Sequence, residues 1–169
     1  QVETNAFWYN ALCFAIDMEN KYGPKKSNDF VARWTPVRDL VRQNFQPTFW
    51  REDWGYLVDY VNNGPQDQAV RPNQLFAVCL EYSPVDDEVI SEVVMTINDE
   101  LVTKRGLRSL SPRNEAYRGV YEGSQIDRDL AYHQGCAFPA LLAPYVDICF
   151  KMMGDAFYKR AEYLTEGFF

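Results

Sequence analysis

Apolar residues recur every three or four positions in six stretches of the chain, which is the spacing of one face of an α-helix. The first stretch ends before Gly23-Pro24, a pair that stops helices. The second stretch contains Pro36 and the fifth contains Pro144, so we expect a kink in one helix and a bend in the other. The predicted helices span about 5–22, 28–45, 72–83, 86–101, 135–153 and 155–164.

Two stretches interrupt this helical pattern. Within residues 46–71, the segment 56–61 is typical of a short strand, and residues 103–134 are long and polar. Loops of such length are uncommon in compact domains unless they are functional. The six helices pair in order as three hairpins, with a polar cluster before the first, third and fifth helices. The chain is therefore predicted to be all-α, with helical hairpins, long loops and one short β-hairpin.

The polar clusters before these three helices combine amides with aromatic residues. They read Glu-Thr-Asn-Ala-Phe-Trp-Tyr-Asn at 3–10, Arg-Pro-Asn-Gln at 71–74 and Asp-Leu-Ala-Tyr-His-Gln-Gly at 129–135. Amide, carboxylate and guanidinium groups can bind sugar hydroxyls, whereas a phosphate site would favour Gly-rich loops and Lys. The clusters therefore indicate a neutral, polyhydroxylated ligand. The alternative is that they are helix caps and polar groups satisfied within the core.

The composition is globular and acidic. The 17 basic and 24 acidic residues give a net charge of −7, and the pI is about 4.7. Nucleic acids and anionic membranes are bound by basic faces, so neither is expected as a partner. The four cysteines form no C-x-x-C pair and lie among apolar residues, which favours reduced thiols in a cytoplasmic protein. With one histidine, a metal site is not expected.

Residue types alone do not identify a catalytic centre. There is no G-x-S-x-G motif, and Cys136 follows His133 too closely along the chain to form a nucleophile–base pair with it. A lone histidine such as His133 is more often a structural hydrogen-bond partner than a catalyst. Two carboxylates can hydrolyse a glycosidic bond, but composition and spacing do not choose a pair among the 24 acids.

Five strings carry a more specific signal because of their order. They read VETNAFWYNAL at 2–12, RPNQLFA at 71–77, LSPRN at 110–114, YRGVYEG at 117–123 and RDLAYHQG at 128–135. Together they resemble the glycogen debranching enzyme family, in its amylo-α-1,6-glucosidase domain, and the resemblance covers almost the whole chain. Residues 137–140 read Ala-Phe-Pro-Ala, where bacterial relatives tend to have Val-Trp-Pro-Trp.

The resemblance implies a fold and a reaction. The fold is an (α/α)6 toroid, of which three hairpins are about half, and residues 1–169 are expected to be a single segment of that domain, truncated at both ends. The reaction is inverting hydrolysis of α-1,6-linked glucose stubs in a glycogen-like glucan, by two carboxylates about 6.5–9.5 Å apart. No metal or organic cofactor is implied. In relatives the two carboxylates precede and follow the matched region, so we expect no catalytic residue here and no activity of the isolated segment.

Glucose contacts are expected from the helix starts and from the matched strings. Glu122 and Asp129 are expected to orient hydroxyls or to hold arginines such as Arg71 and Arg118. The expected partner is glycogen or a related α-glucan, and the open flanks of a half-ring favour a homodimer. The alternative function is a non-catalytic glucan-binding or structural helical module. The expected substrate-binding residues are Trp8, Asn10, Asn73, Gln74, Glu122, Asp129, His133 and Gln134.

Overall fold

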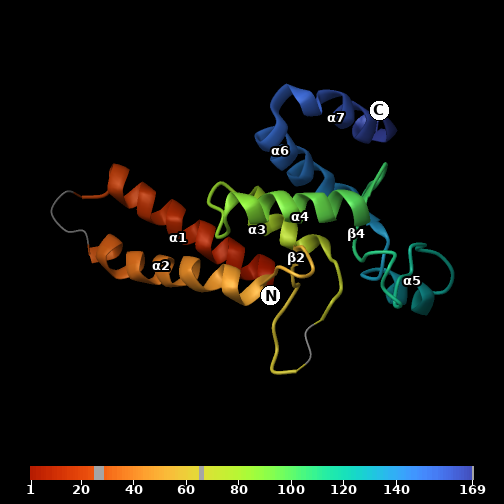
Figure 1. The fold of residues 1–169 in the computed structure, drawn as a ribbon, viewed down its shortest axis with the longest axis horizontal. Helices are drawn as coiled ribbons and strands as arrows, with labels where there is room; N and C mark the ends of the chain where they lie inside the picture. The colour runs from red at the N-terminus through yellow and green to blue at the C-terminus, as the bar shows by residue number, and fades with distance from the viewer. Residues whose placement is uncertain (25–28, 65–66, 169) are drawn as a thin grey trace.

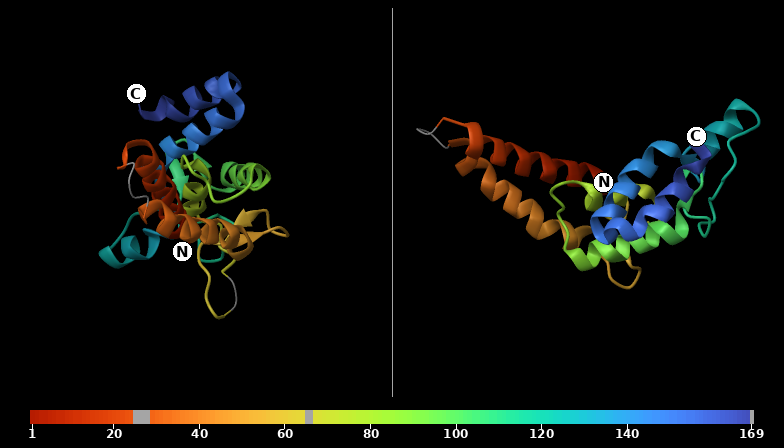
Figure 2. Two further views of the ribbon diagram at one scale, coloured as in Figure 1. Left: turned by 90° about the vertical axis from the view of Figure 1, so that its left-hand side faces the viewer. Right: turned by 90° about the horizontal axis from the view of Figure 1, so that it is seen from above.

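The computed structural model describes residues 1–24, 29–64 and 67–168. Two long helices, α1 (Val2–Tyr22) and α2 (Asp29–Phe49), form an antiparallel hairpin that projects from one side of the molecule (Figures 1 and 2). The Gly23 N–H donates to the Glu19 carbonyl and ends α1 where the sequence predicts. The predicted start of the second helix, at residue 28, lies outside the described residues, and α2 continues past its predicted end and includes Pro36 and Pro47.

Shorter helices build the centre of the molecule. A 3-10 turn, η1 (Pro72–Gln74), leads into α3 (Leu75–Cys79), and α4 (Asp87–Glu100) follows. Proline at the first helical position and acidic residues in the first turn favour these two starts. Both helices are confirmed, although α3 is much shorter than the predicted 72–83 because the chain becomes extended at Leu80.

The C-terminal part adds a third helical pair. The last two long elements are α6 (Leu142–Met153) and α7 (Tyr158–Thr165), joined by η3 (Gly154–Phe157) and followed by η4 (Glu166–Phe168). Helix α3 packs against both α1 and α6 as well as against α4. The first helices of the three pairs are therefore successive neighbours, as the hairpin plan requires.

Two small antiparallel sheets join the helices. In the first, β1 (Trp50–Arg51) pairs with β2 (Tyr56–Leu57), so the predicted strand at 56–61 is confirmed only in its first two residues. The second has the order β3-β4-β5, from Val102–Thr103, Gly106–Arg108 and Ala137–Phe138. The fold is therefore mostly α-helical, as predicted, with one more small sheet than the sequence indicates.

The stretch 103–134 and the start of the fifth predicted helix differ from expectation. The stretch contains β4 and a further helix, α5 (Gln125–Ala131), whose N-terminus is capped reciprocally by Ser124 and Asp127. The predicted helix from Gly135 is wrong up to Leu141, because these residues form β5 and the turn η2 (Pro139–Leu141). Since α6 begins at Leu142, Pro144 lies in its first turn, where its missing N–H has no helical acceptor to lose.

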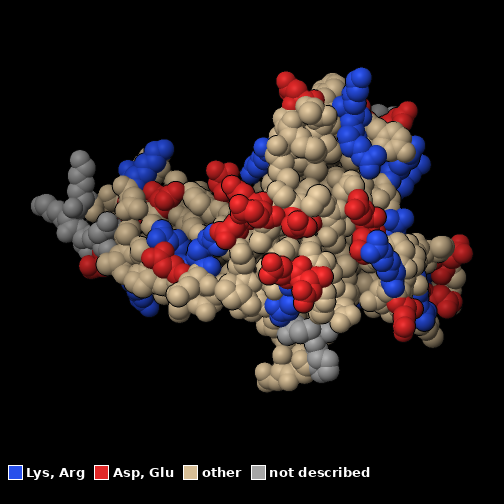
Figure 3. All heavy atoms as spheres, in the orientation of Figure 1, with Lys and Arg blue, Asp and Glu red and all other residues tan. Residues whose placement is uncertain are grey.

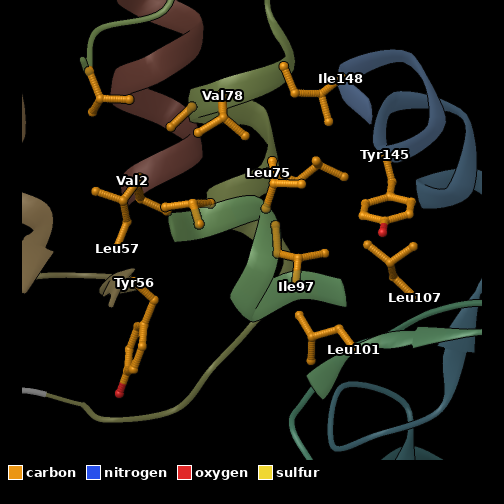
Figure 4. Close-up of a cluster of buried hydrophobic side chains, with 14 of the residues drawn as sticks. Val2, Tyr56, Leu57, Leu75, Val78, Ile97, Leu101, Leu107, Tyr145 and Ile148 are labelled. Atoms are coloured by element: carbon orange, nitrogen blue, oxygen red, sulfur yellow. The ribbon is translucent and has the colours of Figure 1, made fainter. Parts of the chain in front are cut away.

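One hydrophobic core connects the elements. Leu75 of α3 and Ile97 of α4 are fully buried at its centre, between Val2 at the start of α1 and Tyr145 of α6 (Figure 4). The Tyr145 hydroxyl donates to Asn98 Oδ1 at 3.0 Å, which satisfies its polar end within the core. Because burial of each large apolar side chain stabilises the fold by about 1.5–3 kcal/mol, this core holds the start of α1 and the loops that precede α3 and α6 at fixed positions.

Candidate functional site

Arg71 connects three segments that are far apart in the sequence. Its Nη1 donates to the carbonyl oxygens of His133 (2.7 Å) and Ser109 (3.1 Å), and its Nη2 donates to Gln134 Oε1 (3.2 Å). Arg71 immediately precedes η1, so it joins the start of α3 to the chain that leads into β5 and α6. We call Arg71, Ser109, His133 and Gln134 the Arg71 junction.

Ser109 is the buried member of the junction and fixes the backbone of residues 135–136 by two hydrogen bonds. It is 6% exposed, its Oγ accepts the Gly135 N–H at 2.9 Å, and its own N–H donates to the Cys136 carbonyl at 3.1 Å. Gly135 has φ +139°, and a Cβ there would lie 2.5 Å from the Tyr117 ring. Only glycine fits this conformation and this close approach. The backbone at 133–136 is thus fixed independently of any ligand.

Aromatic side chains border the junction. The Tyr132 ring centroid lies 4.5 Å from that of His133, 5.4 Å from that of Phe138 and 6.0 Å from that of Tyr121. The His133 and Phe138 rings are nearly parallel, at 6°. We call Tyr121, Tyr132, His133 and Phe138 the aromatic group. A cavity of about 250 Å³ opens beside it, lined by its two tyrosines and Phe138 together with Cys136 and Ala137.

A second polar group lies at the start of α1. Asn73 Nδ2 donates to Asp59 Oδ1 at 2.9 Å, and the Asp59 carbonyl accepts the Val2 N–H at 2.9 Å. Glu3 Oε2 is buried and has no hydrogen-bond partner among the described residues. Burial raises the pKa of Glu3, and the charge of Asp59 adds to this effect. Glu3 is therefore a carboxyl group with an unused hydrogen-bonding atom, close enough to Asp59 to feel its charge.

The structure places the predicted binding residues in different surroundings. Asn73, His133 and Gln134 lie on the segments that Arg71 joins. Trp8 instead packs edge-on against Trp34 of α2, with 5.9 Å between ring centroids, and Asn10 Oδ1 accepts the Tyr82 N–H beyond the end of α3. Trp8 remains 45% exposed beside this contact, and the bond between Asn10 and Tyr82 uses only the Oδ1 of the Asn10 amide, so both stay predicted binding residues.

Gln74 also has a structural environment. It is 1% exposed, its Oε1 accepts the Leu57 N–H at 3.1 Å, and its Nε2 donates to the Arg71 carbonyl at 3.0 Å. Its amide therefore ties β2 to the turn before α3. Nothing in this geometry directs the Gln74 side chain toward a ligand.

Glu122, which precedes α5, and Asp129, which lies within α5, are both exposed. Asp129 Oδ1 accepts a bond from Gln125 Nε2 at 2.7 Å. Within the described residues no ion pair joins either carboxylate to Arg71 or Arg118. Arg71 is instead held by the carbonyls of Ser109 and His133 and by the side-chain amide of Gln134.

Sequence reasoning did not single out Ser109, Tyr121 or Phe138 as site residues. Tyr121 lies inside a matched string, and Phe138 is the retained aromatic at 137–140, so both had a signal. Ser109 had none, because only the pairing of β4 with β5 brings it to Gly135. Among the described residues, no group of three or more His, Cys, Asp or Glu side chains could hold a metal ion. No helix within the same residues is long and apolar enough to cross a membrane.

The fold and the junction define a mostly helical protein with a polar site beside exposed aromatic rings, at the starts of neighbouring helices. The family model described as amylo-alpha-1,6-glucosidase matches residues 1–166, and the chain belongs to that family. It is also 27% identical over 170 residues to the glycogen debranching enzyme of Saccharomyces cerevisiae (strain ATCC 204508 / S288c), a match covering 79% of this chain. The match covers 11% of that relative's length.

Proposed function

We propose that this chain is the part of an amylo-α-1,6-glucosidase domain that holds the α-1,6-linked glucose stub of a glycogen-like glucan. The observation that carries the proposal is the Arg71 junction beside the aromatic group, a fixed set of polar groups next to exposed rings. Family membership supports a role in glycoside hydrolysis.

The groups at the junction have complementary tasks. Tyr121 and Tyr132, 49% and 46% exposed, offer ring faces on which the C–H groups of a pyranose can pack. Gln134 Oε1 is used by Arg71, so its Nε2 is the group that would donate to a hydroxyl. The His133 ring and the exposed carboxylates of Glu122 and Asp129 would complete the set of donors and acceptors.

The two catalytic carboxylates are proposed to lie outside residues 1–169, as the resemblance implies. A general acid needs a raised pKa. Asp127, which caps α5, is not suited to this role, because hydrogen bonds from Ser124 lower its pKa. The 169-residue chain by itself would then bind glucan without hydrolysing it and would need no cofactor.

The successive packing of α1, α3 and α6 supports a half-toroid, with these three as inner helices and α2, α4 and α7 as outer ones. A half-ring leaves two open flanks, and Phe14, Leu40 and Phe168 are 54%, 60% and 46% exposed. Self-association, with a dimer as the simplest form, would cover such surfaces. All four cysteines are free, which agrees with a reducing, cytoplasmic location.

The experiment is a calorimetric titration of the chain with panose, a trisaccharide that ends in an α-1,6-linked glucose. Tyr132→Ala and His133→Ala are expected to weaken binding about two- to tenfold each, the effect of one lost contact to a neutral partner. Tyr158→Ala on α7, also an exposed tyrosine, is the matched control and should bind as the wild type does. Circular dichroism checks that each variant folds.

Unchanged affinity in both site variants, with folding intact, would contradict the proposal. Glucose released from panose by the chain, at a rate above buffer, would contradict the placement of the catalytic carboxylates outside it.

A further inference from the structure

A second cavity lies close to the chain segments that form the Arg71 junction but is lined by different residues. It has a volume of about 390 Å³ and lies between the β1–β2 turn, the C-terminal end of α4 and residues 111–115. Two of its lining residues, Ser111 and Val70, are joined by a bond of 3.0 Å from the Ser111 N–H to the Val70 carbonyl. We call it the Trp54 cleft, after the largest side chain that lines it.

The aromatic wall of the cleft is rigid. Trp54 stacks on Tyr56, with ring centroids 5.6 Å apart and 29° between the planes. Tyr56 is 8% exposed, and its hydroxyl donates to the Gln68 carbonyl at 2.8 Å. Thr96 Oγ1 of α4 donates to the Gly55 carbonyl at 2.9 Å and fixes the turn between the two rings. A ligand that packs on Trp54 therefore does not have to order this wall.

Polar groups face the aromatic wall. The Glu100 side chain is 12% exposed and pairs through Oε1 with Arg113 Nη1 at 3.2 Å, while Arg113 itself is 80% exposed. Asn114 Oδ1 already accepts the Ala116 N–H, so its amide N–H2 group is the part that can donate to a ligand. Arg113 and Asn114 belong to the matched string at 110–114, which the Arg71 junction does not use.

The charges at the cleft disfavour anionic ligands. Glu100 and Glu115 outnumber Arg113 among its lining residues. Acidic side chains also gather over α4 and beside it (Figure 3). The exposed Glu92 of α4 is the acidic residue nearest to Gly55, in the turn that carries Trp54. Phosphorylated and carboxylated compounds would be repelled by this surface. A neutral ligand with many hydroxyls fits the lining instead, because carboxylate, guanidinium and amide groups together both donate and accept.

We infer that the Trp54 cleft is a second sugar-binding site, which holds one or two hexose units of an α-glucan whose branch point lies at the Arg71 junction. Its volume is at the lower end of the roughly 300–1,000 Å³ typical of small-molecule sites, which suits a mono- or disaccharide. The identity of the glucan rests on the proposed function, whereas the site itself rests on the stacked rings and the Glu100–Arg113 pair.

The test is a titration of the ¹⁵N-labelled chain with maltotetraose, observed through the indole N–H signals of its four tryptophans. The Trp54 signal is assigned by its loss in Trp54→Phe, which keeps a ring on Tyr56. We expect this signal to shift and saturate. We expect Arg113→Ala to weaken binding and so to raise the dissociation constant about three- to tenfold. Arg33→Ala, at the far end of α2, is the matched control and should leave the titration unchanged.

The outcomes separate this inference from the proposed function. If other indole signals saturate while the Trp54 signal stays in place, or if the Trp54 shift does not depend on Arg113, the inference is wrong. The Arg71 junction and the aromatic group contain no tryptophan, so their role is tested by the panose titration and not by these signals. If the Trp54 shift depends on Arg113 while Tyr132→Ala and His133→Ala leave the panose affinity unchanged, the cleft binds sugar and the proposed role of the junction fails. If no indole signal moves at millimolar maltotetraose, the inference alone fails.

Discussion

Gln74 offers a direct test of whether a predicted glucose contact is in fact a structural residue. In Gln74→Leu, the Leu57 N–H and the Arg71 carbonyl lose their bonds of 3.1 and 3.0 Å to the side chain. Each buried group left without a partner costs about 1–3 kcal/mol. The leucine fills most of the same space, so the two unpartnered groups together should lower the free energy of unfolding by ~2–6 kcal/mol. That is a large fraction of the about 5–15 kcal/mol that stabilises a typical domain.

The assay is urea unfolding followed by circular dichroism, with panose affinity measured on the folded variant. Gln43→Leu, at an exposed position of α2, is the matched control and should change stability by less than about 0.5 kcal/mol. We expect Gln74→Leu to lower the unfolding midpoint and to keep most of its panose affinity where it remains folded. An unchanged midpoint together with lost affinity would refute this reasoning and return Gln74 to the ligand-binding set.

Three further predictions follow from burial and backbone geometry. Because burial raises the pKa of Glu3 above 4.5, its contribution to stability is present at low pH and is lost as pH rises through the folded-state pKa. Glu3→Gln should therefore be more stable than wild type by about 1 kcal/mol at pH 7 but not at pH 4. Urea unfolding at both pH values measures this, and an equal difference in stability at the two pH values would contradict it. Gly106 has φ +127°, and a Cβ there would lie 2.4 Å from the Phe138 carbonyl oxygen. Gly106→Ala should therefore lower the stability by at least about 2 kcal/mol in thermal unfolding. This loss should exceed that of Gly154→Ala, where no atom of the described residues beyond the chain neighbours would lie within 4 Å of the Cβ. Burial raises the pKa of Cys79 to about 11. At pH 8, Cys79 should therefore react with iodoacetamide about a hundredfold more slowly than free cysteine. Mass spectrometry of the alkylated chain measures the rate, and a rate equal to that of free cysteine would refute the burial effect.

The local sequence pattern was sufficient to predict the long helices and to identify the family. The apolar spacing in α1, α2 and α4 depends on neighbours within two turns, and Gly23 and Asp87 mark helix boundaries through local hydrogen bonding and the helix dipole. The ordered strings contain the residues of the Arg71 junction except Ser109, so the region of the site was predictable as well.

Tertiary contacts decided the structure of residues 135–141 and the surroundings of the polar side chains at the site. Residues 135–141 have a helical pattern of apolar residues, but the pairing of Phe138 with Leu107 makes them a strand and a turn, a choice that no local spacing contains. The same pairing brings Ser109 to Gly135 and thereby creates the junction. The two amides of Asn73 and Gln74 are adjacent in sequence, yet one lies partly exposed beside Asp59 and the other is buried against β2. Which polar side chain faces a ligand and which faces the core is set by long-range packing, because the same groups can satisfy either environment.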